Sequence, residues 1–362
     1  MSSIGNQLKI TIFGESHGPA IGVTMDGLPG GQPLDFDAVL VQMARRAPGD
    51  GRYGTYRKEA DYPEIISGVK DGVTTGFPLC AMIQNTNAHS NDYKNLRRVP
   101  RPSHADYTAF VKYYGAADMA GGGHFSGRLT APLVFAGAVC RQMLERQGII
   151  IGAHVRSLYN IEDDPFDTVQ PDTTLLNTLN KQPFAVCNDT AKQNMYDLIA
   201  TCRKELDSVG GIVELAAVGL PAGLGGPLFA GLEGKLSQYL FGIPAVRGVS
   251  FGTGFAATRM HGSEHNDSFP VQDGRVVTVT NHCGGIQGGI TNGMPLILQV
   301  AFKPTASISR EQQSVNLDTM QPETLVIKGR HDPCIVPRAV VCVESAVAVC
   351  LTDLLLQNGL IQ

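Results

Sequence analysis

The chain has 362 residues, enough for one large domain or two. Hydrophobic residues make up 43% of it, which excludes an intrinsically disordered protein because such a chain can bury a sizeable core. The formal net charge of −4 argues against nucleic-acid binding through the overall field of the protein. Basic residues still cluster locally, at Arg45-Arg46, within residues 52–57 and within residues 97–101, which favours a small anionic ligand over a polymer.

The cysteines and the most apolar segment bear on compartment. None of the eight cysteines forms a Cys-x-x-Cys pair, so we expect neither a zinc ribbon nor a thioredoxin-like dithiol. No secretory signal precedes Gly5, and we interpret the cysteines as reduced thiols of a cytoplasmic protein. Residues 339–356 are strongly apolar, but Glu344 and Asp353 interrupt them, so we expect no membrane span.

The first half of the chain predicts short strands and two helices. Asp35 or Asp37 can cap a helix that ends at Arg46, before the stop signal Pro48-Gly49. A second helix is expected from Ser126 or Thr130 to Gln147, with Gly148 after its end. This second helix is rich in small residues around Gly137, so it can pack closely against its neighbours. Strands are expected over residues 8–13, 65–69, 79–83 and 149–155.

The second half begins with a polar segment, residues 160–185, in which we expect a mobile excursion. Asn188-Asp189 can cap a helix that ends near Gly210-Gly211, and a buried final helix is expected over residues 338–357. Strands are expected over residues 212–218, 276–280 and 296–302. Helices and strands interleave without a repeat, which indicates an α+β or α/β fold with an interior helical layer.

Three distant segments each place a histidine among glycine, proline and charged residues: Gly14-Glu15-Ser16-His17-Gly18, Arg101-Pro102-Ser103-His104-Ala105-Asp106 and Gly329-Arg330-His331-Asp332-Pro333. Histidine transfers protons near neutral pH, and loops can gather such groups on a rigid scaffold. Plainer interpretations stay open. His17 can be a turn histidine, the His104 segment a surface salt-bridge cluster, and the Asp332 segment a helix-capping loop.

Other segments indicate anion binding. Arg46 ends a helix, where a cation also stabilises the helix dipole, but Arg52 and Arg57 stand in a glycine-rich loop. The segment from Gly121 to Arg128 offers N–H groups to an anion as it enters a helix. Lys303-Pro304-Thr305-Ala306-Ser307 suits a phosphate, with an ordinary turn as the alternative. No Rossmann fingerprint, P-loop, metal-ligand spacing or hydrolase nucleophile elbow stands out. The pattern predicts a polyanionic small substrate that loses or transfers phosphate or carboxylate.

Taken in order along the chain, these motifs resemble those of the chorismate synthase family. The resemblance also rests on Asp26-Gly27-Leu28-Pro29-Gly30-Gly31, Leu220-Pro221-Ala222-Gly223-Leu224-Gly225 and Asn281-His282-Cys283-Gly284-Gly285-Ile286. It implies that 5-enolpyruvylshikimate 3-phosphate loses phosphate and a ring proton in a 1,4-anti elimination that gives chorismate. It also implies reduced FMN as the cofactor, without net redox change. An external flavin reductase or another source supplies the reduced flavin, and NADP is a nucleotide associated with the family.

The resemblance assigns roles residue by residue. It implies that His17 protonates reduced flavin, His104 protonates the departing phosphate, and Asp332 assists the flavin N5 in removing the ring proton. The residues implied to bind substrate are Arg46, Arg52, Arg101, Ser126, Arg128 and Arg330. Those implied to bind the cofactor are His124, Phe125, Ser126, Ala245, Gly288, Lys303, Pro304, Thr305, Ala306, Ser307 and Arg330.

The same resemblance implies a single domain over residues 1–362, a β-α-β sandwich with a helical layer between two antiparallel sheets, and a homotetramer. The chain departs from the family pattern at His124-Phe125 and Leu129, where many members have Arg-Ser and Glu. It also has Ala47, Ser103 and Pro244 where arginine, glycine and asparagine are usual. Two other hypotheses remain: a flavoprotein oxidoreductase with net redox chemistry, and a binding paralogue that has lost catalysis.

Overall fold

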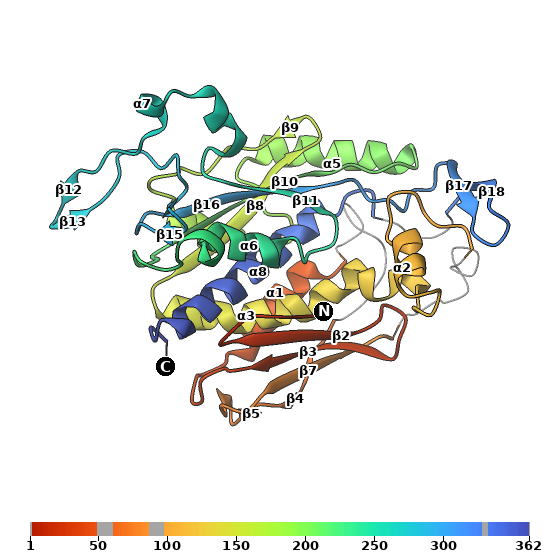
Figure 1. The fold of residues 1–362 in the computed structure, drawn as a ribbon, viewed down its shortest axis with the longest axis horizontal. Helices are drawn as coiled ribbons and strands as arrows, with labels where there is room; N and C mark the ends of the chain where they lie inside the picture. The colour runs from red at the N-terminus through yellow and green to blue at the C-terminus, as the bar shows by residue number, and fades with distance from the viewer. Residues whose placement is uncertain (1, 49–60, 87–97, 328–331, 362) are drawn as a thin grey trace.

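The computed structural model of the chain describes residues 2–48, 61–86, 98–327 and 332–361. Two five-stranded sheets, in which all neighbouring strands are antiparallel, frame its main body (Figure 1). The first sheet contains, in spatial order, β1 (Ser3–Ile4), β2 (Lys9–Gly14), β3 (Ala20–Asp26), β7 (Leu79–Gln84) and β4 (Glu64–Ser67). The second contains β11 (Val246–Phe251), β16 (Leu296–Phe302), β10 (Gly211–Val218), β8 (Ile150–Leu158) and β9 (Ile161–Glu162).

Three helices lie between these sheets in Figure 1: α1 (Phe36–Arg46), α3 (Thr130–Arg146) and α8 (Val336–Gln357). Helix α3 packs against β2, β3 and β7, whereas α8 packs against β8 and β10, and α1 contacts both helices. The remaining helices are α2 (Asp106–Lys112), α4 (Thr173–Leu179), α5 (Asp189–Lys204), α6 (Leu232–Leu240) and α7 (Gly262–His265). Short hairpins are β5–β6 (Val69–Lys70, Val73–Thr74), β12–β13 (Val271–Gln272, Arg275–Val276), β14–β15 (Ile286–Gln287, Ile290–Thr291) and β17–β18 (Gln312–Asn316, Gln321–Leu325). The predicted α+β class is confirmed.

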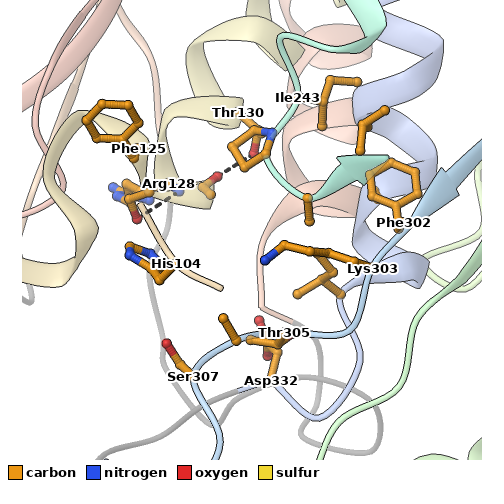
Figure 2. Close-up of a pocket in the computed structure, with 18 of the residues that line it drawn as sticks. His104, Phe125, Arg128, Thr130, Ile243, Phe302, Lys303, Thr305, Ser307 and Asp332 are labelled. Carbon is orange, nitrogen blue, oxygen red and sulfur yellow. Dashed lines mark hydrogen bonds between the residues drawn. The ribbon is translucent and has the colours of Figure 1, made fainter. Parts of the chain in front are cut away.

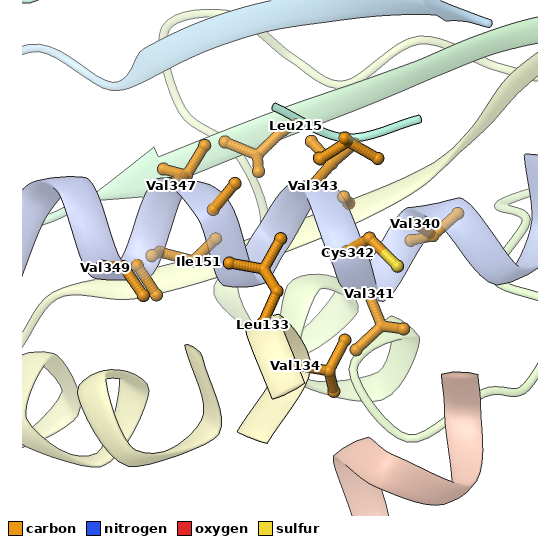
Figure 3. Packing of buried hydrophobic residues seen from close by; sticks show 14 of the residues in the cluster. Leu133, Val134, Ile151, Leu215, Val340, Val341, Cys342, Val343, Val347 and Val349 are labelled. Atoms are coloured by element: carbon orange, nitrogen blue, oxygen red, sulfur yellow. The ribbon is translucent and has the colours of Figure 1, made fainter. Parts of the chain in front are cut away.

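The crossing of α3 and α8 is close because a glycine stands at the contact. A Cβ atom on Gly137 would lie 2.2 Å from the Cβ of Ser345. Figure 3 shows the branched side chains of α8, including Val340 and Val347, packed among Leu133 of α3 and Leu215 of β10. The prediction that small residues let this helix approach its neighbours is confirmed.

A buried ion network fixes the three helices relative to one another. The Glu344 carboxylate on α8 accepts hydrogen bonds from Arg45 of α1 at 2.5 Å and from Arg141 of α3 at 3.0 Å. It also accepts a hydrogen bond from the Ala153 amide of β8 at 3.1 Å. The Glu344 side chain is 1% exposed, so these partners offset the cost of burying its charge.

Most predicted helix boundaries are confirmed by their caps. Asp35 accepts a hydrogen bond from the Ala38 amide at the start of α1, and Asn188 does the same for α5. The predicted end of α5 near Gly210 is wrong: the helix ends at Lys204 because Leu206 adopts a positive φ of 60°. The strand expected over residues 276–280 is also wrong. There the Thr278 hydroxyl donates to the Thr280 carbonyl oxygen, and the Thr280 hydroxyl donates to Asp267. Within residues 276–280, only Val276, the last residue of β13, pairs with another described strand.

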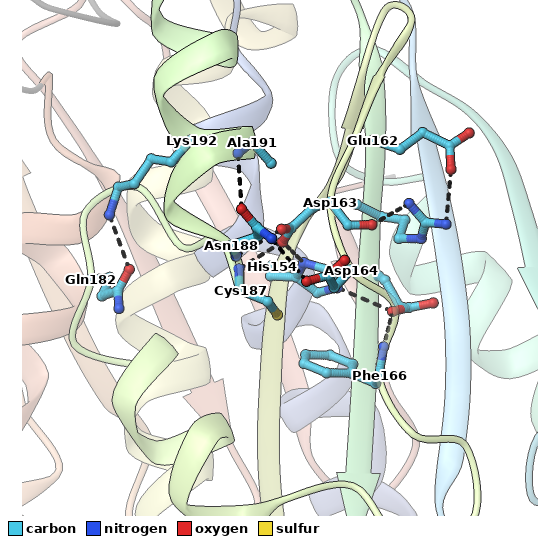
Figure 4. A network of polar contacts seen from close by, with 12 residues as sticks. His154, Glu162, Asp163, Asp164, Phe166, Gln182, Cys187, Asn188, Ala191 and Lys192 are labelled. Atoms are coloured by element: carbon cyan, nitrogen blue, oxygen red, sulfur yellow. Dashed lines mark hydrogen bonds and ion pairs between the residues drawn. The ribbon is translucent and has the colours of Figure 1, made fainter.

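Residues 160–185 contain features that the sequence did not predict. They include α4, whose Leu176 and Leu179 are buried against the core, together with the buried Phe166. His154 of β8 joins this segment to the sheet, because its Nδ1 lies 2.7 Å from Asp163 and its Nε2 lies 3.1 Å from Glu214 of β10 (Figure 4). The segment is therefore packed onto the second sheet rather than detached from it.

Helix α8 is long and apolar enough to cross a membrane by length and composition. Its two acidic residues, Glu344 and Asp353, are thus not enough to exclude a membrane span. The helix is a core element because 94% of its most apolar window is buried inside the protein. All eight cysteines are free thiols, as predicted, and five of them are buried.

Candidate active site

A cavity of about 590 Å³ gathers most of the predicted site residues (Figure 2). Its wall is built from the loop before α2, the turn before α3, the loop before β11, the segment after β16 and the start of α8. Loops from elements far apart in sequence therefore meet at one place, as the three histidine segments suggested. The predicted residues that line it are Arg46, Arg101, His104, His124, Phe125, Ser126, Arg128, Ala245, Lys303, Pro304, Thr305, Ala306, Ser307 and Asp332.

Two other predicted site residues do not line the cavity, and two lie outside the described residues. His17 is not a lining residue, but the preceding Ser16 is, and the His17 ring lies against Gly121: a Cβ there would be 2.1 Å from the ring. Gly288 is exposed in the turn of the β14–β15 hairpin and does not line the cavity. Arg52 and Arg330 lie outside the described residues, as do Arg57 and His331, so their assigned roles stay predictions.

His104 belongs to a buried polar cluster. Its Nδ1 lies 2.7 Å from an oxygen of Asp106, the first residue of α2. Arg101 donates from Nε and Nη2 to the same carboxylate at 2.7 Å each, and from Nη1 to Ser307 at 3.0 Å. Burial alone would raise the pKa of Asp106, but the hydrogen bonds from Arg101 and His104 hold it well below its ordinary value.

A second cluster joins two of the predicted anion-binding arginines. Arg46 and Arg128 each donate an Nη1–H group to a different oxygen of Asp61, whose side chain is fully buried. Arg46 also donates to the Thr130 hydroxyl at 3.2 Å, at the start of α3. Burial opposes ionisation of Asp61, but the charges of Arg46 and Arg128 hold its pKa below the ordinary value. The two guanidinium groups are therefore fixed in position beside the cavity.

Asp332 also lines the cavity, and Figure 2 shows it below Thr305. Arg338, on the first turn of α8, donates to Asp332 Oδ2 at 2.6 Å and to the Arg46 carbonyl oxygen at 2.9 Å. The other oxygen of Asp332, Oδ1, is buried and has no hydrogen-bond partner among the described residues. A buried acceptor without a hydrogen-bond partner costs folding free energy, and it marks a place where a ligand group can donate a hydrogen bond.

The departures from the family pattern at His124, Phe125 and Leu129 lie in the turn before α3. His124 donates from Nδ1 to the Gly14 carbonyl oxygen at 2.8 Å, and its Nε2 lies 2.7 Å from the Ser2 hydroxyl. It therefore ties this turn to the end of β2 and to the residue before β1. Phe125 is 38% exposed and lies beside Tyr113, with ring centroids 6.4 Å apart.

Three charged residues of the site were not predicted from the sequence. Asp61 and Asp106, which do not line the cavity, bind its arginines, and Arg338 of the wall binds Asp332. Asp106 carried a signal, since it lies in the same motif as His104, but Asp61 carried none. The apolar part of the wall includes Ile243 and Phe302, which come from ordinary core patterns. In this wall, aliphatic and aromatic side chains face charged groups, as in sites that bind a ring bearing anionic groups.

One cluster outside the cavity also has metal-ligating residue types. His154, Asp163 and Cys187 place one ligand atom each within 4.8 Å of the others. Both ring nitrogens of His154 already face carboxylates, and Asp163 accepts hydrogen bonds from the Cys187 and Asn188 amides at 2.6 and 2.9 Å. The geometry is that of a satisfied buried ion network.

Proteins of one known family match almost the entire chain. The family model described as "Chorismate synthase" matches residues 8–356. A chorismate synthase from Dehalococcoides mccartyi is 45% identical over 99% of this chain and 98% of its own length. One from Thermococcus gammatolerans is 46% identical over 98% and 97% of the two chains. A solved structure titled "Crystal Structure of Chorismate Synthase" superposes with a TM-score of 0.75 at 26% identity, covering 98% of this chain and 93% of the other. The chain belongs to the chorismate synthase family.

Proposed function

We propose that the cavity is where this enzyme eliminates phosphate from 5-enolpyruvylshikimate 3-phosphate to form chorismate, with reduced FMN bound beside the substrate. The observation that carries the proposal is the charge of the wall. Among its described lining residues, five are arginine or lysine and one is a carboxylate: Arg46, Arg101, Arg128, Lys303 and Arg338 against Asp332. A concave site with this excess of positive charge favours a substrate that carries phosphate and carboxylate groups.

The wall also suits a flavin. Phe125, Ile243 and Phe302 offer apolar surface for a ring system, and the unpartnered Oδ1 of Asp332 offers an acceptor for a ring N–H. Burial and the nearby Arg247 lower the pKa of Lys303, as expected for a cation at the edge of a closed site. We propose that His124, Phe125, Ser126, Ala245 and the segment from Lys303 to Ser307 hold the cofactor. Reduced FMN, when bound, lends electron density to the substrate as phosphate departs.

The residues themselves would move protons and hold charge. His104 is placed among cations that can bind the phosphate, and as an acid it would protonate that leaving group. Asp332 would accept or relay the ring proton at Oδ1, while Arg338 fixes Oδ2. His17, whose ring lies against Gly121, would protonate the flavin, and Arg46 and Arg128 would bind the substrate anions.

The family's further properties follow as proposals. We propose that the two sheets and the helices between them form the β-α-β sandwich of the family, as one domain over residues 1–362 in the cytoplasm. We also propose a homotetramer, which is supported by large exposed apolar side chains at Leu228, Phe229 and Phe255. The segment with α7 and the β12–β13 hairpin extends away from the main body in Figure 1, as a contact arm between copies would. An external source of reduced flavin, NADP-dependent or otherwise, stays a prediction.

The proposal is tested by mixing the purified enzyme with 5-enolpyruvylshikimate 3-phosphate and chemically reduced FMN without oxygen. We expect chorismate and phosphate in equal amounts, and a flavin spectrum that returns to the reduced form after turnover. Formation of neither product would refute the activity, and stoichiometric flavin oxidation would favour an oxidoreductase. We expect His104→Ala to lower kcat by roughly 10²- to 10⁴-fold. Wild-type turnover in that variant would remove the role assigned to His104.

A further inference from the structure

We propose that Asp106 is a positioning residue for the acid: it holds the Nδ1–H group of His104, so that the proton which His104 transfers resides on Nε2. The inference rests on the proposed role of His104 as general acid. Its basis is the distance of 2.7 Å between His104 Nδ1 and Asp106 Oδ1, in a cluster where the Asp106 side chain is 5% exposed. A carboxylate only accepts hydrogen bonds, so at this distance Nδ1 is the donor.

Arg101 strengthens this assignment. Its Nη2 lies 3.1 Å from the same Nδ1 of His104, which by itself would allow Nδ1 to accept. The shorter contact decides against this, because Nδ1 lies 2.7 Å from a carboxylate oxygen that can only accept, so Nδ1 carries a proton. Arg101 donates one N–H group each from Nε and Nη2 to Asp106 at 2.7 Å and from Nη1 to Ser307 at 3.0 Å. The Arg101 backbone amide also donates to Asp106, at 3.0 Å. The carboxylate therefore contacts both cationic groups when His104 is protonated, and it offsets one of their two positive charges.

The opposite edge of the ring is open. Cε1 and Nε2 of His104 face Gly122, where a Cβ atom would lie 3.5 Å from each of them. No hydrogen bond joins Nε2 to another described residue, and the His104 side chain is 19% exposed on the cavity wall. With Nδ1 held from behind, Nε2 is the nitrogen that faces the ligand. This arrangement of a carboxylate, a histidine and a substrate is one that orients a proton donor.

The same contacts give Arg101 a second role. The resemblance implies that Arg101 holds a substrate anion, and each of its three donor nitrogens gives one N–H group to Asp106 or Ser307. Arg46 is engaged in the same way, by Thr130, Asp61 and the Gly127 carbonyl oxygen. Arg101 therefore supports Asp106 and keeps one N–H group on each Nη for the implied substrate contact.

The proposal is tested with Asp106→Asn, which keeps the size of the side chain and removes its charge. Without the carboxylate, Arg101 and a protonated His104 face each other at 3.1 Å, so the neutral ring is favoured. We expect kcat at neutral pH to fall by about 10- to 100-fold, the alkaline limb of the kcat–pH profile to move to lower pH, and KM to change little. Asp106→Glu should restore part of the activity. Asp172→Asn is the matched control: it removes the charge of the residue that caps α4, which does not line the cavity, and keeps a capping oxygen, so it should keep the wild-type profile.

A measurement on the wild-type enzyme keeps the proposal falsifiable if Asp106→Asn does not fold. Magic-angle-spinning spectra of enzyme labelled with ¹⁵N at its nine histidines report which ring nitrogen carries the proton, with His104 assigned by its loss in His104→Gln. At a pH where His104 is neutral, a proton on Nδ1 supports the proposal and a proton on Nε2 overturns it. A wild-type kcat–pH profile in folded Asp106→Asn also overturns it. In both cases the role of His104 as acid stands or falls separately, by the activity of His104→Ala.

Discussion

Asp61 is expected to be the carboxylate on which the anion-binding arginines depend. It has no exposed side-chain surface, and Arg46 and Arg128, which are 4% and 8% exposed, both donate to it. Asp61→Asn removes the charge and little else, because asparagine tolerates the φ of 45° at this position. The variant leaves two buried guanidinium groups without their shared counter-charge, and one of them faces an amide N–H in place of an acceptor.

The size of the effect follows from burial. Removal of one partner from a buried ion pair costs about 3–5 kcal/mol of unfolding free energy. Arg46 keeps the Thr130 hydroxyl at 3.2 Å and Arg128 keeps the Asn85 side-chain oxygen at 3.1 Å, so we expect a loss near the lower end of that range. The pKa of Asp61 is lowered in the folded state, so its contribution is present above its unfolded pKa of about 3.9 and is lost as the pH falls. The difference between wild type and Asp61→Asn should therefore be constant at neutral pH and narrow below about pH 4.

The assay is urea unfolding of both proteins at matched concentration across this pH range. Asp318→Asn is the control, because it breaks an ion pair with Arg98 in which the side chains are 54% and 72% exposed. That change should cost at most about 1 kcal/mol. Equal stability losses in the two variants at pH 7, or a deficit in Asp61→Asn that persists unchanged through acid pH, would refute the reasoning.

Two further predictions concern the packing of α3 on α8 and the buried network of His154, Asp163 and Glu214. Gly137→Ala should lower the unfolding free energy by about 1–3 kcal/mol, since the added Cβ would lie 2.2 Å from Ser345. Gly234→Ala in α6 is the control: a Cβ there meets no atom within 4 Å, so this change should raise the unfolding free energy by up to about 1 kcal/mol. Changes of the same sign in urea unfolding would contradict this. Glu214→Gln should destabilise the enzyme most near neutral pH. Burial opposes the charge on His154, but its carboxylate partners raise its pKa, so the stability that charged His154 contributes is lost at alkaline pH. The pKa of Glu214 is lowered in the folded state, so the stability that its carboxylate contributes is lost at acid pH. A destabilisation that does not vary between pH 4 and 10 would contradict the network.

The sequence predicted local structure well where a local cause was present. The caps Asp35 and Asn188 and the terminal Gly148 mark helix ends by short-range hydrogen bonds and by a positive φ of 75° at the glycine. It failed where distant contacts decide. Residues 160–185 are polar on average, yet Leu176 and Leu179 bury one face of α4 against β8, which composition does not reveal. The threonines near residue 280 favour strands, but no strand within the described part of the chain pairs with them.

In the candidate site too, residues with a local signal were predicted and residues placed by distant contacts were not. The second group bears on mechanism. Cations near glycines and histidines were visible in the sequence, but their carboxylate partners were not recognised as such. Asp61 serves Arg46 and Arg128, and Asp106 serves Arg101 and His104, so each carboxylate is shared by two cationic or ionisable groups. Each cluster thus retains net positive charge when His104 is protonated. It is also fixed by hydrogen bonds before any ligand arrives, so the cost of immobilising the arginines falls on folding rather than on the reaction. An elimination that develops negative charge on departing phosphate gains most from cations held in this way.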